Sequence, residues 1–403
     1  MNSALKNHAT YINNKVDTNE ISLSQYISTD NILQNKQGIE CATSLPIQGG
    51  KVTAFKKGDI LLANIRPYLK KIWYAQFDGG CSADVLAIRA NAETDSHFLF
   101  YALFRDDFFI HAMKGAKGTK MPRGDKTQIM EFKIPIFDLK TQQSIAAVLS
   151  ALDKKISLNK QINARLEEMA KTLYDYWFVQ FDFPGANGKP YKSSGGDMVF
   201  DETLKREIPK GWKVKSLGEI ENNIITGKTP STQYSNFFNG DIPFITIGDI
   251  RNNTFIIKTE QNLSIEGANN QKNKYLPEGS LCVSCIATVG LIGFTTRQAQ
   301  TNQQINSIIF KHDYNKEFLY FYLKDYFLVG KAKTGNTFAN MNKGDFEKIL
   351  VLYPNLKLLQ KYSNKMVLVF NQINNLSKQN HQLTQLRDFL LPMLMNGQVS
   401  VAK

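Results

Sequence analysis

The chain carries two versions of one pattern, and this internal duplication restricts its possible folds more than any other feature. The segment "KGTKMPRGDKTQI" (117–129) resembles "NTFANMNKGDFEKI" (336–349). Residues that match at a spacing of 220 are Met121 and Met341, Gly124 and Gly344, Asp125 and Asp345, and Ile129 and Ile349. Further pairs follow in the same order at spacings of 219 and 218, namely Pro135 with Pro354 and Lys160 with Lys378. The sequence therefore predicts two similar halves.

Each half presents the same succession of local patterns. An apolar, strand-like run follows a glycine turn in "KKGDILLANI" (56–65) and again in "PEGSLCVSCI" (277–286). An aromatic, helix-like pattern comes next, in "HFLFYALFRDDFF" and in "EFLYFYLKDYFL". Each half then ends with a basic glycine-containing loop, a short strand with proline and a long helix. Strands and helices mixed in this way predict an α/β (mixed α+β) fold, repeated twice.

Two long helices are predicted from apolar residues at alternating spacings of three and four. The first seam runs through 141–177 and contains Leu149, Leu152, Ile156, Asn159, Asn163, Leu166, Ala170, Leu173 and Trp177. The second runs through 357–395 and contains Met366, Val369, Ile373, Leu376, Asn380, Leu383, Arg387, Leu390 and Leu394. A helix of about 35 residues spans roughly 50 Å. We expect the two seams to pack on each other as an antiparallel coiled coil, and the alternative is two ordinary core helices.

The charge of the chain points to a polyanionic partner. Its 49 lysines and arginines outnumber its 36 acidic residues, which gives a net charge of +13 and a pI near 9.3. Nucleic acid is the first candidate for such a protein. The alternative is a protein that is simply basic.

The glycine-containing loops supply most of the candidate DNA contacts, because lysine suits phosphates while asparagine and arginine also suit base edges. The first loop supplies Lys114, Lys117, Lys120, Arg123 and Lys126. The second supplies Lys331, Lys333, Asn336, Thr337, Asn340, Asn342 and Lys343. Asn64, Arg66, Lys228 and Thr229 are further candidates. The alternative for the loops is a solvated charged surface.

The segment "ITGKTPST" (225–232) resembles the end of a phosphate-binding loop but does not fulfil its requirements. Such a loop needs a glycine where this chain has Asn222. Pro230 also opposes the helix whose N-terminus would hold the phosphate. The segment is better interpreted as a turn in which Lys228 could meet a phosphate.

Other chemistry finds little support in the sequence. Cys282 and Cys285 form one Cys-x-x-Cys pair without a second pair, so no metal site is predicted. No methyltransferase, hydrolase or dinucleotide-binding motif is present, so no catalytic residue is predicted. The uncharged run 279–296 is rich in glycine and β-formers, which favours buried strands over a membrane span.

Several motifs resemble those of type I restriction-modification DNA specificity subunits. They are "IPKGWKVKSLGEI" followed by "ITGKTPST", "TNQQINSI" (301–308), the stretch from "QQSIAAVLSALDKK" to "YDYWFVQFDFP", and "LRDFLLPMLMNGQVSV". Together they cover most of the chain in the order of that family. The first half departs from the pattern, because it has no "GKTP" turn, and residue-by-residue correspondence is not extended to residues 1–50.

The resemblance implies two target recognition domains separated by two long antiparallel helices with pseudo-twofold symmetry. The expected divisions are residues 1–140 (first recognition domain), 141–178 (central conserved helix), 179–212 (linker), 213–355 (second recognition domain) and 356–403 (distal conserved helix and tail). The implied function is to read a bipartite duplex DNA target while scaffolding other subunits, without catalysis. The alternative is a helical scaffold that binds DNA only non-specifically.

The resemblance also implies the partners and their cofactors. The expected partners are double-stranded DNA, two methyltransferase subunits and restriction motor-nuclease subunits. S-adenosylmethionine would belong to the methyltransferase, ATP and Mg²⁺ to the restriction subunit, and no cofactor to this chain. The start "MNSALKNHATYINN" has no apolar core of a signal peptide, so a cytoplasmic location without membrane contact is expected.

Overall fold

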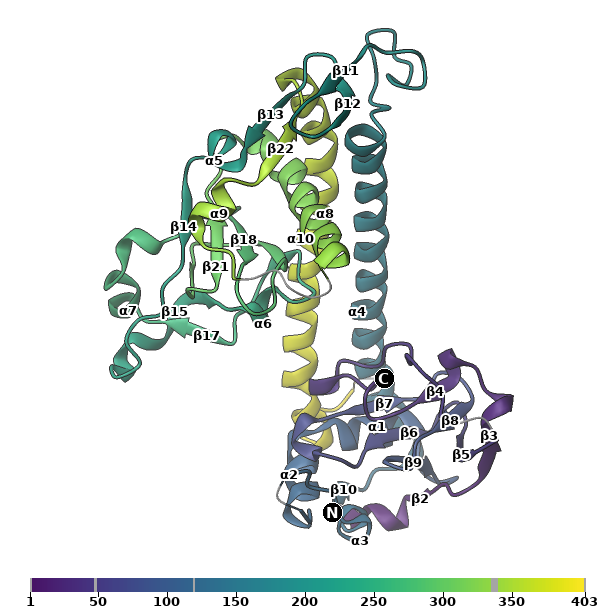
Figure 1. Cartoon of the computed structure of the whole chain (residues 1–403). Coiled ribbons are helices and arrows are strands. Elements are labelled where there is room, and N and C mark those ends of the chain that lie inside the picture. The colour runs from purple at the N-terminus through teal and green to yellow at the C-terminus, as the bar shows by residue number, and fades with distance from the viewer. Residues whose placement is uncertain (1, 47–48, 119, 335–339, 402–403) are drawn as a thin grey trace. The chain divides into compact units, whose positions relative to one another are not determined.

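The computed structural model describes residues 2–46, 49–118, 120–334 and 340–401, and the chain divides into two compact units (Figure 1). The first unit contains Met1–Ile156 and Gln382–Lys403, and the second contains Ser157–His381. Two long helices, α4 (Leu139–Tyr174) and α10 (Leu356–Met395), contribute a part to each unit.

The first unit is a mixed α/β structure with two four-stranded sheets and a short two-stranded one. Its strands are β1 (Asn2–Ala4), β2 (Ala9–Tyr11), β3 (Lys15–Asp17), β4 (Tyr26–Ile27), β5 (Lys51–Phe55), β6 (Ile60–Ala63), β7 (Ile72–Tyr74), β8 (Gly79–Cys81), β9 (Val85–Ala90) and β10 (Lys133–Pro135). Its shorter helices are α1 (Ser96–Phe104), α2 (Asp106–Lys114) and α3 (Lys126–Met130). The sheets have the orders β2-β9-β6-β7, β3-β5-β8-β4 and β1-β10.

Strand β6 forms the centre of this unit because both of its faces are apolar. Ile60 and Leu62 point into a core shared with α1, while Leu61 and Ala63 point into a second core with Trp73. Alternate residues of a strand face opposite sides, so a strand buried on both sides needs a continuous apolar run. The run "ILLA" meets that requirement.

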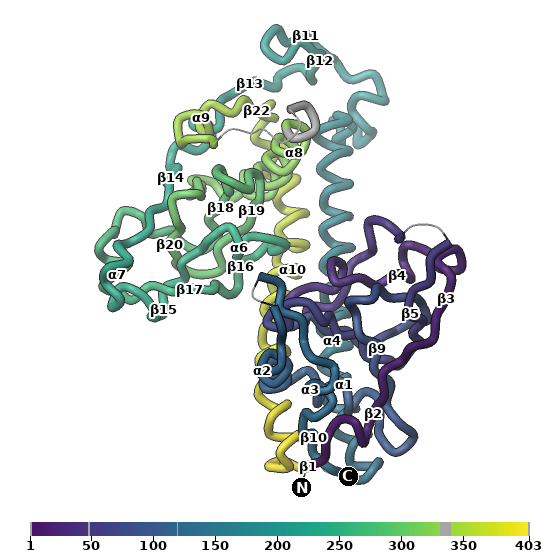
Figure 2. Tube along the Cα trace, turned by 60° about the horizontal axis from the view of Figure 1, so that its bottom comes forward, coloured from purple at the N-terminus to yellow at the C-terminus, as the bar shows by residue number. Residues whose placement is uncertain are grey.

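The second unit repeats this plan with additions. Its strands are β11 (Met198–Asp201), β12 (Arg206–Pro209), β13 (Lys213–Ser216), β14 (Ile224–Thr226), β15 (Phe238–Ile245), β16 (Phe255–Ile256), β17 (Gln261–Leu263), β18 (Leu281–Ser284), β19 (Ile292–Thr295), β20 (Gln300–Thr301), β21 (Ile305–Ile308) and β22 (Leu350–Tyr353). Its shorter helices are α5 (Leu217–Ile220), α6 (Ile247–Ile250), α7 (Ile265–Asn269), α8 (Lys316–Thr334) and α9 (Lys343–Glu347). Figure 2 follows the same elements along the Cα trace.

The central sheet of the second unit has the strand order β14-β21-β18-β19-β16, which matches the order of the first unit with one strand added. Leu281 and Val283 of β18 face the core that contains α8, and Cys282 faces a separate apolar cluster. The predicted buried strands in 279–296 are confirmed, because β18 and β19 pair antiparallel there. None of the helices in the described part of the chain is long and apolar enough to cross a membrane.

Matching caps align the two long helices residue by residue. The side chain of Asp138 accepts a hydrogen bond from the amide of Thr141 at 2.9 Å, and Asn355 accepts one from Leu358 at 3.0 Å. These side chains satisfy amides that a helix start leaves unpaired. The caps lie 217 residues apart, as do the first helical residues of α4 and α10. The landmark spacings of 218–220 in the sequence therefore differ slightly from the spacing of the structure.

The seams of α4 and α10 pack together, and their middle is polar. In the second unit the Nδ2 of Asn159 donates to Gln379 Oε1 at 2.6 Å and to Asn380 Oδ1 at 3.0 Å. Asn163, one turn later, donates to Ser377 Oγ at 3.1 Å, so the helices run antiparallel in this unit. In the first unit, Leu149 and Leu394 are buried in one core. The predicted fold class is confirmed in these features: a mixed α/β protein with two similar regions and two long helices packed together.

Candidate nucleic-acid interface

The basic loop of the first unit connects α2 and α3, and the structure describes it on both sides of residue 119. The backbones of Lys117 and Arg123 exchange two hydrogen bonds of 2.9 Å. The five predicted cations of this loop are all exposed: Lys114, Lys117, Lys120, Arg123 and Lys126. The structure therefore places them along one short segment whose backbone is partly fixed.

Two exposed ion pairs leave these cations available to a ligand. Arg123 lies 3.0 Å from Asp84, and Lys117 lies 3.9 Å from Asp125. The side chain of Lys117 is 87% exposed and that of Arg123 is 61% exposed. Exposed pairs of this kind contribute at most about 1 kcal/mol, so a phosphate can compete for the cations.

Asp125 is a structural member of this loop. Its carboxylate caps α3 by accepting a hydrogen bond from the amide of Gln128 at 2.9 Å. That hydrogen bond is the main reason why the pKa of Asp125 lies below its usual value. The carboxylate stays charged, and it holds α3 directly behind the basic loop.

Asn64 and Arg66, in the turn after β6, lie against the basic loop although they are distant from it in sequence. The amide of Arg66 donates to the carbonyl of Pro122 at 2.7 Å, and the amide of Gly124 donates to the carbonyl of Asn64 at 3.0 Å. Ile65 and Arg123 form an antiparallel bridge between the same segments. The structure thus brings these two predicted residues together with the loop.

The corresponding region of the second unit is described only in part. Asn336 and Thr337 lie outside the described residues, and the side chains of Lys331 and Lys333 are not described. Asn340 and Lys343 are exposed, and Lys343 lies 3.4 Å from Glu347.

Asn342 has a structural role in this segment. Its Oδ1 accepts from the amide of Asp345 at 2.9 Å, and its Nδ2 donates to the carboxylate of Asp345 at 2.7 Å. The side chain therefore caps α9 and has both of its polar atoms engaged.

Lys228 and Thr229 lie next to the turn between β20 and β21. The amides of Gly227 and Lys228 donate to the carbonyls of Ile305 at 3.1 Å and Thr301 at 2.9 Å. A phosphate-binding loop would need such amides for its ligand. A Cβ on Gly227 would lie 2.2 Å from the carbonyl oxygen of Asn302, so glycine is required by the close approach of two backbones. The amides of Gly227 and Lys228 are therefore engaged by backbone carbonyls instead of being free to bind a phosphate.

Comparison with known proteins assigns the chain to a family. The sequence model of the "Type I restriction modification DNA specificity domain" matches residues 4–168 and 209–385. The "Type I restriction enzyme HindI specificity subunit" of Haemophilus influenzae is 34% identical over 96% of this chain and 97% of its own length. The MjaIX specificity subunit of Methanocaldococcus jannaschii is 29% identical over 76% of this chain and 69% of its own.

The chain belongs to the type I specificity family. A crystal structure of the type I restriction-modification S subunit from M. genitalium has the same fold, with a TM-score of 0.59 and 16% identity over 98% of this chain and 96% of that one. The protein is thus a DNA specificity subunit of a type I restriction-modification system. Subunits of this family are non-catalytic and carry no cofactor of their own.

The cysteines of this specificity subunit are mostly inert. Cys81, Cys282 and Cys285 are buried, whereas Cys41 is exposed. Burial raises the pKa of the Cys81 and Cys282 thiols to about 12 and that of Cys285 to about 11. Thiols in this state are poor ligands and nucleophiles. Among the described residues, no group of three or more His, Cys, Asp or Glu side chains could hold a metal ion.

The candidate residues predicted from the sequence left out one polar edge of the specificity subunit. The turn 302–304 consists of Asn302, Gln303 and Gln304, and Gln303 accepts a hydrogen bond from Thr229 Oγ1 at 2.7 Å. Three consecutive amide side chains between two short strands were the available signal. Pairing this turn with Thr229 required the fold.

Proposed function

We propose that this specificity subunit reads a bipartite duplex target, with one half-site for each recognition domain (residues 1–140 and 213–355). The proposal is supported above all by the strand order that the central sheets of the two units share. In the first unit, the loop that precedes α3 also presents exposed cations. Two similar readers in one chain suit a split site, as the two halves of a dimer suit two half-sites. Residues 179–212 would act as the linker.

The proposed contacts divide into two kinds. The exposed lysines suit phosphate oxygens and would provide affinity without sequence preference. The arginines and asparagines can also reach base edges. The proposed set contains Lys114, Lys117, Lys120, Arg123, Lys126, Asn64, Arg66, Lys228, Thr229, Lys331, Lys333, Asn336, Thr337, Asn340, Asn342 and Lys343.

The long helices (141–178 and 356–403 with its tail) would scaffold the other subunits. They expose large apolar side chains, among them Leu158 (50% exposed), Leu368 (71%) and Phe389 (64%). Side chains of this kind in an exposed position suit a protein partner. The proposed partners are two methyltransferase subunits and the restriction motor-nuclease, which would supply S-adenosylmethionine, ATP and Mg²⁺ chemistry in the cytoplasm.

A domain exchange tests this proposal. Residues 213–354 are replaced by the equivalent segment of a relative, and the chimera is produced with its methyltransferase subunit in a host without other modification systems. Mapping of methylated bases should show one half of the target changed and the other retained. A chimera that changes both halves, or a wild-type complex that modifies no defined sequence, would exclude bipartite reading. Equal affinity for all duplexes would instead favour the non-specific scaffold.

A further inference from the structure

The two units share one unusual turn after their central strand. Arg66 has φ 52° and Ala287 has φ 64°, in the left-handed region that glycine normally occupies. Each residue lies six positions after the first residue of its strand, Ile60 in β6 or Leu281 in β18. The strands themselves are equivalent, because Ile60 pairs with Ile88 and Leu281 pairs with Ile308.

In both units the turn is held by a hydrogen bond from the residue just before the cap of the following short helix, α3 or α9. In the first unit the carbonyl of Asn64 accepts from the amide of Gly124, the residue before the cap of α3. In the second unit the carbonyl of Cys285 accepts at 2.9 Å from the amide of Met341, the residue before the cap of α9. The surrounding structure therefore maintains one strained backbone in two places, and such positions cluster at binding sites.

The side chains on this common backbone differ. The first unit has the polar pair Asn64 and Arg66, whereas the second has Cys285 and Ala287 at the same positions. Asn64 Oδ1 and Arg66 Nε are buried, and within the part of the chain that the structure describes neither has a hydrogen-bond partner. Buried polar atoms are normally paired, so the Asn64 and Arg66 side chains have hydrogen-bonding capacity that the described chain does not use.

We propose that positions 66 and 287 are matching base-reading positions, with Arg66 reading a guanine in one half-site and Ala287 making no such demand in the other. This inference rests on the proposed function. Arg66 is partly buried, and its neighbour Ile65 forms a backbone bridge with Arg123, which in turn bridges to Lys117. Lys117 and Arg123 are exposed cations that suit phosphates near the base that Arg66 would read. An arginine guanidinium can donate two hydrogen bonds to O6 and N7 of guanine, a pattern that only guanine offers in the major groove. The Ala287 methyl group can only make apolar contact.

The test uses the complete complex with its methyltransferase and maps methylated sites across a host genome. In the Arg66→Ala variant one guanine of one half-site should no longer be required, with discrimination at that position reduced about tenfold or more. The other half-site should be unchanged. Arg66→Lys should relax the same position, because a lysine keeps the charge but loses the two-pronged geometry.

Two further variants separate reading from folding. Arg66→Gly removes the backbone strain, so its melting temperature should equal or exceed that of the wild type while the guanine requirement is still lost. Lys133→Ala removes an exposed cation of β10 and should leave the target unchanged. A wild-type complex that methylates a split target, together with Arg66 variants that keep every required base, would overturn the inference but leave the proposed function intact. Uniform loss of methylation in a stable Arg66→Gly protein would also overturn it, since that result indicates a phosphate contact.

Discussion

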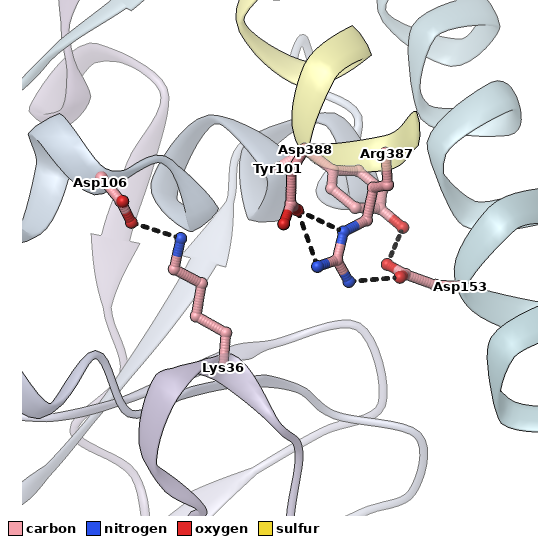
Figure 3. A network of polar contacts seen from close by, with 6 residues as sticks. All are labelled: Lys36, Tyr101, Asp106, Asp153, Arg387 and Asp388. Carbon is pink, nitrogen blue, oxygen red and sulfur yellow. Dashed lines mark hydrogen bonds and ion pairs between the residues drawn. The ribbon is translucent and has the colours of Figure 1, made fainter. Parts of the chain in front are cut away.

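The two units pack the long helices against a shorter helix with different side chains: charged and polar ones in the first unit, and apolar ones in the second. In the first, Asp153 of α4 accepts from Tyr101 at 2.7 Å and from Arg387 of α10 at 2.8 Å (Figure 3). The guanidinium of Arg387 also lies 4.8 Å from the ring centre of Phe104. Figure 3 also shows Lys36, whose Nζ lies 2.6 Å from Asp106. The network joins the two long helices to α1 of the same unit.

The equivalent positions in the second unit are apolar. Counting from the helix caps, Asp153 corresponds to Phe370 and Arg387 corresponds to Ala170. Counting from the start of α1 and α8, Tyr101 corresponds to Phe321, whose ring centre lies 5.9 Å from that of Phe370. A salt-bridged triad in one unit is thus an aromatic contact beside a buried alanine in the other. At this position the space is filled in both units and the charges of the triad are paired, but the fold does not require a particular chemistry.

Breaking the triad should have the largest effect on stability. Arg387→Ala leaves the Asp153 carboxylate, whose side chain is 29% exposed, without its cation, at a cost of about 3 kcal/mol, the lower end of the range for a buried pair. Urea denaturation of the full chain, with hydrogen exchange to localise the loss to the first unit, measures the effect. The triple change Tyr101→Phe, Asp153→Phe and Arg387→Ala copies the second unit and should recover most of the loss. A triple variant as unstable as the single one would show that the two arrangements are not interchangeable.

The stability of the two units should depend on pH in opposite directions, because one acidic residue and one histidine have shifted pKa values. Burial raises the pKa of Glu317, near the start of α8, to about 7. The folded form then binds more protons than the unfolded one, so the second unit should lose stability as pH rises from about 4.5 to about 7, by up to about 3 kcal/mol. The matching residue near the start of α1 is His97, and burial lowers the pKa of its imidazole. Its contribution has the opposite slope, because stability rises with pH until the unfolded histidine has also lost its proton, near 6.5.

Glu317→Gln tests the first of these effects. It should flatten the pH dependence of hydrogen exchange in the second unit and leave that of the first unchanged. Glu202→Gln is the matched control, because its side chain is 81% exposed. A slope that persists in Glu317→Gln would assign the pH dependence to other groups.

The basic segments should differ in their contribution to DNA affinity. Replacing Lys117, Lys120 and Arg123 with alanine should weaken binding and reduce the slope of log affinity against log salt by up to about 3, since each lost phosphate contact contributes about 0.9. Fluorescence anisotropy of the complex on a short duplex, over a range of salt concentrations, measures the slope. Unchanged affinity and slope would exclude this loop as a contact surface.

The smallest effect is expected in the second unit. Lys343→Ala breaks an exposed pair with Glu347 and should change stability by less than about 0.5 kcal/mol. Its salt slope should fall by about 1 if Lys343 contacts one phosphate. A loss of stability comparable to that of Arg387→Ala would indicate a structural role instead.

The sequence predicted the features that depend on repeated apolar spacing. The seams of α4 and α10 and the buried β18–β19 pair all have runs or periods that one chain segment reveals by itself. The alignment of the two halves was less accurate. Identical residues such as Met121 and Met341 suggested a spacing of 220, whereas the hydrogen bonds made by Gly124 and Met341 are the equivalent ones.

The reason is that the duplication preserves roles more than residue types. Asp125 and Asn342 both cap a short helix, and Ile129 and Phe346 both bury a side chain behind it. The candidate interface was harder still, because the position of Arg66 beside the basic loop depends on contacts between residues nearly 60 positions apart. The residue pattern within a single segment does not predict contacts between segments so far apart.

The unequal burial of the thiols has a practical consequence. Three cysteines are enclosed and protonated at neutral pH, so a maleimide dye should attach to Cys41 alone while the chain stays folded. The wild-type protein thereby offers one labelling point in its first unit, without any engineered residue. Fluorescence from that point can report on assembly of the complex in real time.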